Sequence, residues 1–566
     1  MVREDKNGTK ASATYTPTVT PVTPTAEDTT STDKQGQTQT GTPTFTPGNP
    51  NVPMDDDTPA TFEDGSTTKT VPGEGTYTVA PDGTVTFVPE KSFTGEGTGV
   101  TVKRVDKNGT PVTAKYTPTV TPVTPTATPA ESEAPQGLVQ TGTVTFTEGD
   151  PVAPIDKDTI TLLDETGQPA ASVEAKSPAG DVIGTFTVDK ETGVVTFTPT
   201  DKSYSGDVVP VKVQATDTNG TTVETTYTPK ITPVVPTSED ATTTDIQGAT
   251  QTGKPVFTEG DSRVPMNDDV PATFDDGSTT KTVDGVGTYT VAADGTVTFV
   301  PEPSFTGTAP AVTVVREDKN GTKASATYTP SVTPITVTPT DKVSADVQNV
   351  PQTQTPTFDL SNDKTAEITS KKLVDPATGQ PTDETTVTVA GEGSYTIDPT
   401  TGAVTFTPEK DFVGTAKGVT VQATATITNA NGKTATITSD ATYTPTVVPA
   451  VPTANPATSK DVQGATQTGT PTFAGTTVQV NGEDKAITIK DNSYTLLDKE
   501  GNEVSSTPAY AADGTTEIGT YSIDSATGQV TFTPTDKSYT GVVTPAKVQA
   551  ESSNGIKVDT TYTPEI

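Results

Sequence analysis

Apolar and polar residues alternate along the chain in short runs. In "GTYTVAPDGTVTFVPEKSFTG" at 75–95, Tyr77, Val79, Val85 and Phe87 face one side of an extended chain, whereas threonines face the other. A period of two is typical of a β-strand with one buried face. The two runs are joined through "APDG", whose Asp and Gly suit a tight turn. We therefore predict a pair of antiparallel strands here.

The same alternation continues in "VTVKRVDKNGTPVTAKYTP" at 100–118, where "DKNG" marks another hairpin turn. No amphipathic helix of useful length is present. Strands rich in Thr, Val, Tyr and Phe, with turn signals roughly every 8 to 12 residues, indicate an all-β fold made of antiparallel β-sandwich domains of about seven strands each.

The pattern repeats along the chain. The motif "YTP" recurs at Tyr15, Tyr116, Tyr227, Tyr328, Tyr443 and Tyr562, in steps of 101 to 119 residues. A unit of this length is a small domain, so we expect each repeat to fold by itself. The predicted divisions are 1–24 (the C-terminal tail of a preceding repeat), 25–125, 126–236, 237–338, 339–452 and 453–566. Because residues 1–17 match 314–330 from the second residue on, we expect the chain to be a fragment that begins inside a repeat.

Two features distinguish parts of the repeats. The longer repeats carry similar inserts at 161–185 and 495–520, which we expect to form a loop. Thr/Pro-rich segments such as 117–137 lie between repeats. Proline lacks a backbone donor and fixes φ, so we predict an edge strand followed by a stiff, extended connector that holds neighbouring repeats apart.

Most aromatic residues belong to a recurring set. Five aromatic positions recur in each repeat: Phe45, Tyr77, Phe87, Phe93, Tyr116; Phe146, Phe186, Phe197, Tyr204, Tyr227; Phe257, Tyr289, Phe299, Phe305, Tyr328; Phe358, Tyr395, Phe406, Phe412, Tyr443; Phe473, Tyr521, Phe532, Tyr539, Tyr562. With Tyr15 added, only Phe62, Phe274, Tyr494 and Tyr510 remain of 16 Phe and 14 Tyr. We therefore predict that nearly all rings serve core packing and not ligand stacking.

Composition excludes several classes of function. The sequence contains no Cys, His or Trp, so the usual Cys and His ligand sets for zinc, Ser-His and Cys-His relays, disulfides and thioesters are impossible. A net charge of -36 disfavours nucleic acid and anionic membranes as partners. No apolar run is long enough to span a bilayer. We expect no enzyme, no catalytic residue, no cofactor and no metal.

The repeated motifs resemble those of a known family. "QGQTQTGTPTF" at 35–45, "QGATQTGKPVF" at 247–257 and "QGATQTGTPTF" at 463–473, together with "GTYTV", "VTFTP" and "TYTP", are similar to the CshA-type fibril repeats of streptococcal cell-wall-anchored adhesins. The fourth repeat, "DVQNVPQTQTPTF" at 346–358, lacks the glycine of "QTG", which puts its first turn in question. The resemblance implies an extracellular, wall-anchored fibril in which ligands such as fibronectin bind to a distal adhesive region, with that region and the anchor outside this sequence.

Three kinds of candidate site compete with structural explanations. Asp55–Asp57, echoed at 267–269, could bind calcium weakly, but two repeats lack the cluster. The "NGT" triplets at Asn7, Asn108, Asn219 and Asn320 match a glycosylation sequon, although Asn-Gly is expected in a hairpin turn. An isopeptide crosslink would need a recurring buried lysine; Lys91, Lys202, Lys410 and Lys537 align, but Pro303 takes that place in the third repeat. We therefore predict none of these sites.

Two functions remain open. The first is a structural stalk or spacer that projects the adhesive region in host or interbacterial adhesion, with neighbouring repeats of the chain as partners. The alternative is an array in which the repeats themselves bind a host protein or glycan. An array should keep an exposed polar or aromatic cluster in every repeat, and the recurring residues are mainly strand and turn formers.

Overall fold

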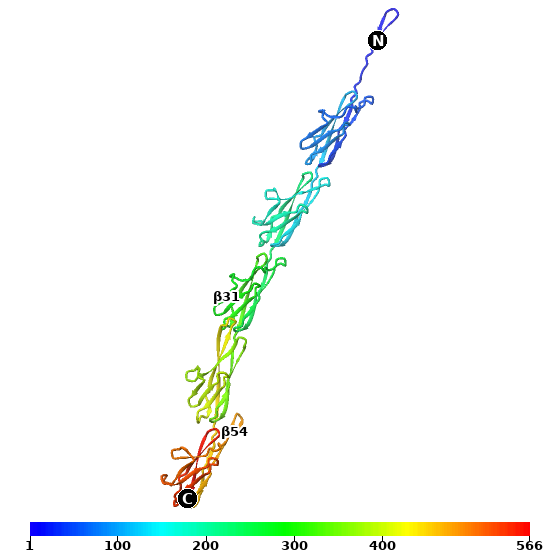
Figure 1. Ribbon diagram of the computed structural model, residues 1–566. Coiled ribbons are helices and arrows are strands. Elements are labelled where there is room, and N and C mark those ends of the chain that lie inside the picture. The colour runs from blue at the N-terminus through cyan, green and yellow to red at the C-terminus, as the bar shows by residue number, and fades with distance from the viewer. The chain divides into compact units, whose positions relative to one another are not determined.

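The computed structural model describes residues 1–566 and contains β-strands but no helix (Figure 1). The chain divides into two compact units. The first comprises Met1–Ser238, Phe257–Val270 and Arg316–Ala324, and the second comprises Glu239–Val256, Pro271–Val315 and Ser325–Ile566. The all-β prediction is confirmed.

A four-stranded antiparallel sheet occurs five times, and its successive copies number repeats 1 to 5. In repeat 1 the order is β5 (Gln39–Gly41), β10 (Val85–Pro89), β9 (Gly75–Val79) and β8 (Thr68–Val71). The other copies are β16 (Gln140–Thr143), β22 (Val194–Pro199), β21 (Val182–Val188), β20 (Ser172–Lys176); β28 (Gln251–Gly253), β33 (Val297–Pro301), β32 (Gly287–Val291), β31 (Thr280–Val283); β39 (Gln352–Gln354), β45 (Val404–Pro408), β44 (Gly393–Ile397), β43 (Thr386–Val389); and β51 (Gln467–Gly469), β59 (Val530–Pro534), β58 (Glu517–Ile523), β57 (Ser506–Tyr510).

A second sheet completes each sandwich. In repeat 1 it contains β4 (Thr29–Lys34), β13 (Pro111–Thr121), β12 (Val100–Val105), β7 (Thr61–Phe62) and β11 (Gly95–Glu96). Its counterparts are β15 (Ala130–Pro135), β25 (Thr222–Thr232), β24 (Val211–Asp217), β18 (Ile155–Leu163), β19 (Pro169–Ala170), β23 (Gly206–Asp207); β27 (Ala241–Ile246), β36 (Lys323–Thr333), β35 (Val312–Glu317), β30 (Thr273–Phe274), β34 (Gly307–Thr308); β38 (Lys342–Val347), β48 (Thr434–Val448), β47 (Val419–Thr428), β41 (Ala366–Asp375), β42 (Gln380–Pro381), β46 (Gly414–Thr415); and β50 (Ala457–Lys460), β61 (Lys557–Glu565), β60 (Ala546–Glu551), β55 (Thr495–Leu497), β56 (Glu503–Val504).

The remaining strands are short and form two-stranded ribbons. They are β1 (Val2–Glu4), β2 (Lys10–Ser12); β3 (Thr25–Glu27), β6 (Thr44–Thr46); β14 (Thr126–Thr128), β17 (Thr145–Thr147); β26 (Thr237–Glu239), β29 (Val256–Thr258); β37 (Val337–Thr340), β40 (Thr357–Leu360); β49 (Thr453–Asn455), β52 (Thr472–Ala474); and β53 (Thr476–Val480), β54 (Glu483–Ile487). Only 122–125, 233–236, 334–336 and 449–452 lie outside strands between the last strand of one repeat and the first of the next. Most of each Thr/Pro segment is therefore strand.

One pairing in each repeat is parallel. β4 pairs with β13 from Thr29 opposite Tyr116 to Lys34 opposite Thr121. On its other side β13 pairs with β12 and β11, so it is a central strand and the predicted edge strand is wrong. Pro118 is tolerated there because it lies opposite 97–99, between β11 and β12, where the antiparallel ladder is interrupted. Its carbonyl accepts a hydrogen bond from Gly97 N at 2.8 Å.

Each sandwich encloses its own core. In repeat 1, Tyr77 and Phe87 from one sheet pack with Val102 and Tyr116 from the other, and all four are buried. The Tyr77 and Phe87 ring centroids are 4.5 Å apart. Separate buried clusters occupy repeats 2, 4 and 5. Three of the five recurring rings in each repeat are buried core residues, and the other two are half-buried, as Phe45 and Phe93 are where they pack against the core of repeat 1. Tyr15 is 86% exposed.

Two sequence-based expectations need correction. Phe62 and Phe274, left outside the recurring set, are 2% and 1% exposed and belong to the buried interior. The insert at 161–185 is not an irregular loop, because β19 pairs with the end of β18 and β20 joins the four-stranded sheet. Backbone pairing thus absorbs most of the extra residues into the two sheets.

Candidate functional site

A buried polar network recurs in all five repeats. In repeat 1, Ser31 Oγ donates a hydrogen bond to Gln39 Oε1 at 2.5 Å and lies 2.6 Å from Tyr116 Oη. Gln39 Nε2 donates to the Thr119 carbonyl at 3.0 Å. Gln39 belongs to the four-stranded sheet, whereas the other three residues belong to the second sheet. The network therefore joins the two sheets of the sandwich.

The same contacts are present in the other repeats. They involve Ser132, Gln140 and Tyr227; Thr243, Gln251 and Tyr328; Ser344, Gln352 and Tyr443; and Ser459, Gln467 and Tyr562. Burial raises the pKa of Tyr116, with the Ser31 hydrogen bond opposing it, so the phenol remains protonated at neutral pH. The sequence motifs identified Gln and Tyr but missed the hydroxyl residue. Its signal was a Ser or Thr eight positions before the Gln in every repeat.

The glycine of "QTG" has a steric explanation. A Cβ atom on Gly41 would lie 2.3 Å from Tyr116 Cε2, so the tyrosine ring occupies the space of a side chain. In repeat 4, Gln354 takes this position, yet β39 still pairs with β45, with Gln354 opposite Val404. The preceding turn also persists because Asn349 adopts a φ of 66° where other repeats have glycine.

A buried carboxylate lies beside the core of repeat 1. Glu74 accepts hydrogen bonds from Tyr77 Oη, from Thr98 N at 2.9 Å and from Thr98 Oγ1 at 2.6 Å. Burial alone would raise the pKa of Glu74, but the bonds from Thr98 and Tyr77 outweigh it and the pKa is lowered. In repeat 3, Val286 takes its place and Tyr289 Oη donates to the Pro310 carbonyl instead. The carboxylate is thus not a chemical feature common to the repeats.

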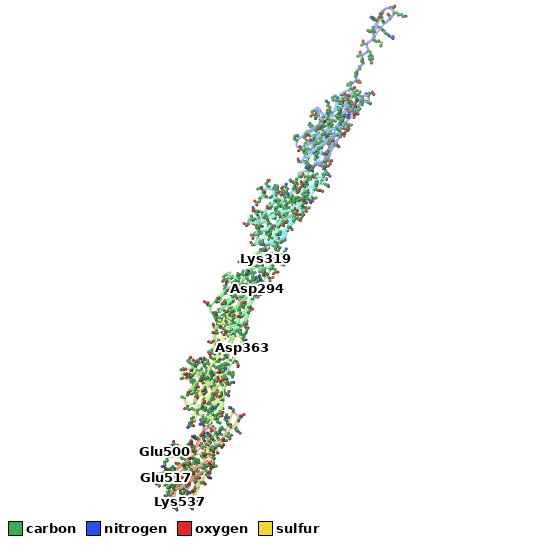
Figure 2. All side chains as sticks on the ribbon, in the orientation of Figure 1. Asp294, Lys319, Asp363, Glu500, Glu517 and Lys537 are labelled. Carbon is green, nitrogen blue, oxygen red and sulfur yellow. The ribbon has the colours of Figure 1, made fainter.

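The acidic cluster at Asp55–Asp57 faces cations. Lys107 Nζ lies 2.6 Å from Asp55 and 2.6 Å from Asp57, and Arg104 lies 2.7 Å from Asp56. Repeat 3 pairs Asp268 with Arg316 at 2.6 Å, and Asp269 with Lys319, labelled in Figure 2. Hydrogen bonds from Lys107 and Thr58 lower the pKa of Asp55. Ion pairing accounts for these carboxylates, and no group of three or more acidic side chains is arranged to hold a metal.

The Asn residues of the "NGT" triplets lie at hairpin turns, as expected for Asn-Gly. In repeat 1, Asp106 Oδ1 accepts hydrogen bonds from Asn108 N at 3.0 Å and Thr110 N at 2.8 Å, which closes the turn. Asn7 and Asn108 have exposed side chains, but Asn219 is only 7% exposed. Burial makes Asn219 inaccessible to a glycosylating enzyme in the folded chain.

The four aligned lysines are exposed. Lys91, Lys202, Lys410 and Lys537 are all at the surface (Lys537 is labelled in Figure 2). An isopeptide bond forms between groups held together away from water, so this exposure gives the lysines no such environment. The structure instead uses the backbone at this position: the carbonyls of Lys91 and Pro303 accept hydrogen bonds from Gln35 and Gln247 at 2.9 and 2.8 Å.

Repeats 1, 2 and 5 carry a surface cavity at one corresponding place that sequence reasoning missed. The cavity in repeat 2 has a volume of about 470 Å³ and is lined by residues including Glu165, Lys176 and Phe186. The corresponding cavity in repeat 5 has about 230 Å³, and there Lys499 Nζ lies 3.4 Å from the Tyr510 ring centroid. In repeat 1, which lacks the insert, the cavity has about 350 Å³ and is lined by residues including Phe62, Asp64 and Lys69. The linings differ in charge and ring content, so the cavities do not present one common chemistry.

The structure contains no helix long and apolar enough to cross a membrane. Comparison with curated protein sequences gave no match. Among solved structures, the protocadherin gamma B4 extracellular domain is 13% identical with a TM-score of 0.27, covering 96% of this chain and 84% of that one. Drosophila N-cadherin EC1-4 is 14% identical with a TM-score of 0.18, covering 75% and 99%. Scores this low add nothing to the assignment.

The family comparison is decisive. The family described as the surface adhesin CshA repetitive domain matches residues 21–120, 122–231, 233–332, 334–447 and 449–566. The five matches together span almost the whole chain and coincide with the five sandwiches seen in the sheet topology. The resemblance read from the motifs is confirmed, and the chain belongs to the family of surface adhesin CshA repetitive domains.

Proposed function

We propose that the chain is the structural stalk of a bacterial surface fibril, which holds a distal adhesive region away from the cell wall in host or interbacterial adhesion. The observation that carries the proposal is the position of the recurring residues. Three of the five recurring rings of each repeat are buried in its core and the other two are half-buried, and the recurring Gln, Ser/Thr and Tyr join its two sheets. What is kept in all five repeats therefore maintains the fold.

The proposal includes location and boundaries. Membership in a surface adhesin family supports an extracellular, wall-anchored protein without enzymatic activity. We propose domain divisions at 25–125, 126–236, 237–338, 339–452 and 453–566, with 1–24 as the tail of a preceding repeat. Fibronectin or other host ligands would bind outside these repeats.

A binding array is the second candidate. Its support is the surface cavity of about 470 Å³ in repeat 2, about 350 Å³ in repeat 1 and about 230 Å³ in repeat 5. Binding by an array should grow with the number of repeats, which calls for one lining chemistry in every repeat. The linings of these cavities differ, so they are weak support for an array.

Small-angle scattering and binding together test the stalk. A compact domain of 100 residues has a radius of gyration of about 13 Å, so five in line should reach on the order of 150 to 200 Å. A maximum dimension of about 80 Å would mean a collapsed chain and contradict the proposal. In surface plasmon resonance, immobilised fibronectin should bind the chain no better than an unrelated acidic β-protein of equal net charge. Saturable binding that grows with repeat number would favour the array.

A further inference from the structure

Contacts between successive repeats recur at the same turn. We name this feature the Gln–Gly turn: Gln35–Gly36, Gln136–Gly137, Gln247–Gly248, the variant Gln348–Asn349, and Gln463–Gly464. Each of the contacts described below joins residues of the same compact unit. They contradict the expectation that the connectors simply hold neighbours apart.

The main-chain carbonyl of the turn glutamine accepts a side-chain hydrogen bond from the following repeat at four turns. The donors and distances are Asn219 Nδ2 to Gln35 at 3.1 Å, Asn320 Nδ2 to Gln136 at 2.6 Å, Thr365 Oγ1 to Gln247 at 2.6 Å, and Asn554 Nδ2 to Gln348 at 3.3 Å. Three of the donors are the Asn of an Asn-Gly hairpin tip. The acceptor is thus constant, while the donor can change.

At three turns the side chain of the turn glutamine accepts a hydrogen bond from the connector of its own repeat. Gln35 Oε1 accepts a hydrogen bond from Val123 N at 3.1 Å, and Gln136 and Gln247 accept bonds from Val234 N and Ile335 N at 3.0 and 3.2 Å. The three connector residues are 5%, 2% and 3% exposed. The connector is therefore fixed beneath the turn and is not a free tether.

Apolar side chains add to two of these contacts. Ile335 of the connector packs with Ala366 and Ile427 of repeat 4, with Ile246 of repeat 3 against them. Between repeats 4 and 5, Val347 and Ala450 pack with Val480 and Ile487. Burial of such groups stabilises an interface by the hydrophobic effect.

The turn glutamines that the following repeat contacts are buried. Gln35, Gln136, Gln247 and Gln348 are 4% to 6% exposed. The residue before the turn varies, since Val347 is 0% exposed whereas Lys34 is exposed. The contact with the following repeat is therefore centred on the glutamine.

We propose that the Gln–Gly turn is a docking surface for the following repeat, and that this interface, rather than proline stiffness, couples neighbouring repeats. The partner it fits is a second repeat of the same family, offering an Asn-Gly hairpin tip or an equivalent hydroxyl. The inference goes beyond the proposed stalk function and stands without it, because it concerns only the coupling of adjacent repeats.

The test uses the full chain and hydrogen exchange read by mass spectrometry. Asn219→Ala should accelerate exchange in 34–41 of repeat 1 about threefold to tenfold, as expected for the loss of one net hydrogen bond. The matched control is Asn108→Ala, at the same hairpin position of repeat 1 but with an exposed side chain that covers no turn. It should change only its own hairpin. If both variants alter only the hairpin that carries them, the proposal is wrong.

A second pair of variants changes the glycine of the Gln–Gly turn instead of the asparagine that contacts the turn. Gly36 and Gly464 have φ values of 79° and 78°, so alanine strains both backbones alike. A Cβ atom would lie 2.5 Å from Asn219 Oδ1 at Gly36, but 3.5 Å from Lys537 Cβ, within the same repeat, at Gly464. Gly36→Ala should therefore accelerate exchange in the 217–221 hairpin of repeat 2, and Gly464→Ala should affect repeat 5 alone. An unchanged 217–221 hairpin would overturn the docking surface.

Discussion

Truncating one core ring should unfold one repeat. Phe299 is 0% exposed in repeat 3, and its ring centroid lies 4.6 Å from that of Tyr289. On another side the ring lies against the backbone, since a Cβ atom on Gly287 would be 2.7 Å from Phe299 Cε2. Strands on both sides limit collapse into the space left by Phe299→Ala. The free energy of unfolding of repeat 3 should therefore fall by about 3 to 5 kcal/mol.

That loss is large for a domain of this size. Small domains have unfolding free energies of about 5 to 15 kcal/mol, so the variant repeat should be marginal at 37 °C. A change of 1 kcal/mol shifts the melting temperature of a small domain by about 4 to 8 °C, which gives a total shift on the order of 10 to 40 °C. Calorimetry of the full chain should show a separate early transition that carries about a fifth of the enthalpy, because enthalpy scales with the number of residues.

Hydrogen exchange identifies which repeats respond. Repeat 3 should lose protection throughout, repeats 2 and 4 should change only near the turns they share with it, and repeats 1 and 5 should be unaffected. Val256→Ala is the control, because Val256 lies in the same repeat and is 50% exposed. Loss of protection in repeat 5 would refute independent folding of the repeats.

Three further predictions follow from single sites. Ser31→Ala should destabilise repeat 1 by about 1 to 3 kcal/mol in thermal melts because it unpairs buried Gln39 and Tyr116, whereas Ser31→Thr should be tolerated because Thr243 fills that role in repeat 3. The pKa of Glu74 is below its ordinary value of 4.5, so the charged carboxylate stabilises repeat 1 above that pH and this contribution is lost as the pH falls. Melting temperatures measured from pH 7 to 3 should therefore depend less on pH in Glu74→Val than in the original chain, and an unchanged slope would contradict this. Intact mass should equal the sequence mass, because Lys91, Lys202, Lys410 and Lys537 are exposed, and a loss of ammonia or water would reveal a crosslink.

The fold could be predicted from the sequence wherever it follows from the local alternation of apolar and polar residues. Alternation around Tyr77 and Phe87 and the turns at "APDG" and "DKNG" correctly predicted paired strands and a core. The parallel strand Thr29–Lys34, "TTSTDK", was not predictable in this way, because it has no apolar residue and its partner lies more than 80 residues away in sequence. Phe62 was missed because the longer repeats have no ring to align with it.

For the candidate sites, the sequence showed the residue patterns but not the groups that these residues contact. Charge and sequon patterns at Asp55–Asp57 and Asn219 were visible, but their partners are set by tertiary contacts. Asp55 faces Lys107 from a hairpin some 50 residues later, and Asn219 faces a carbonyl of another repeat. An Asn-Gly pair is favoured in a hairpin turn for backbone reasons alone, so a second role in docking leaves no separate trace in the composition.

Backbone acceptors explain how the repeats can differ in sequence and still dock. The residue before the turn glutamine is Lys34, Pro135, Ile246 or Val347, and its chemistry ranges from charged to apolar. The acceptor that the following repeat uses is nevertheless the glutamine carbonyl, which no substitution removes. Variation beside the turn can thus adjust each interface, as Val347 does by packing with Val480 and Ile487, without changing its basic hydrogen bond. Such an interface lets one repeat follow another in any number, which a spacer of adjustable length requires.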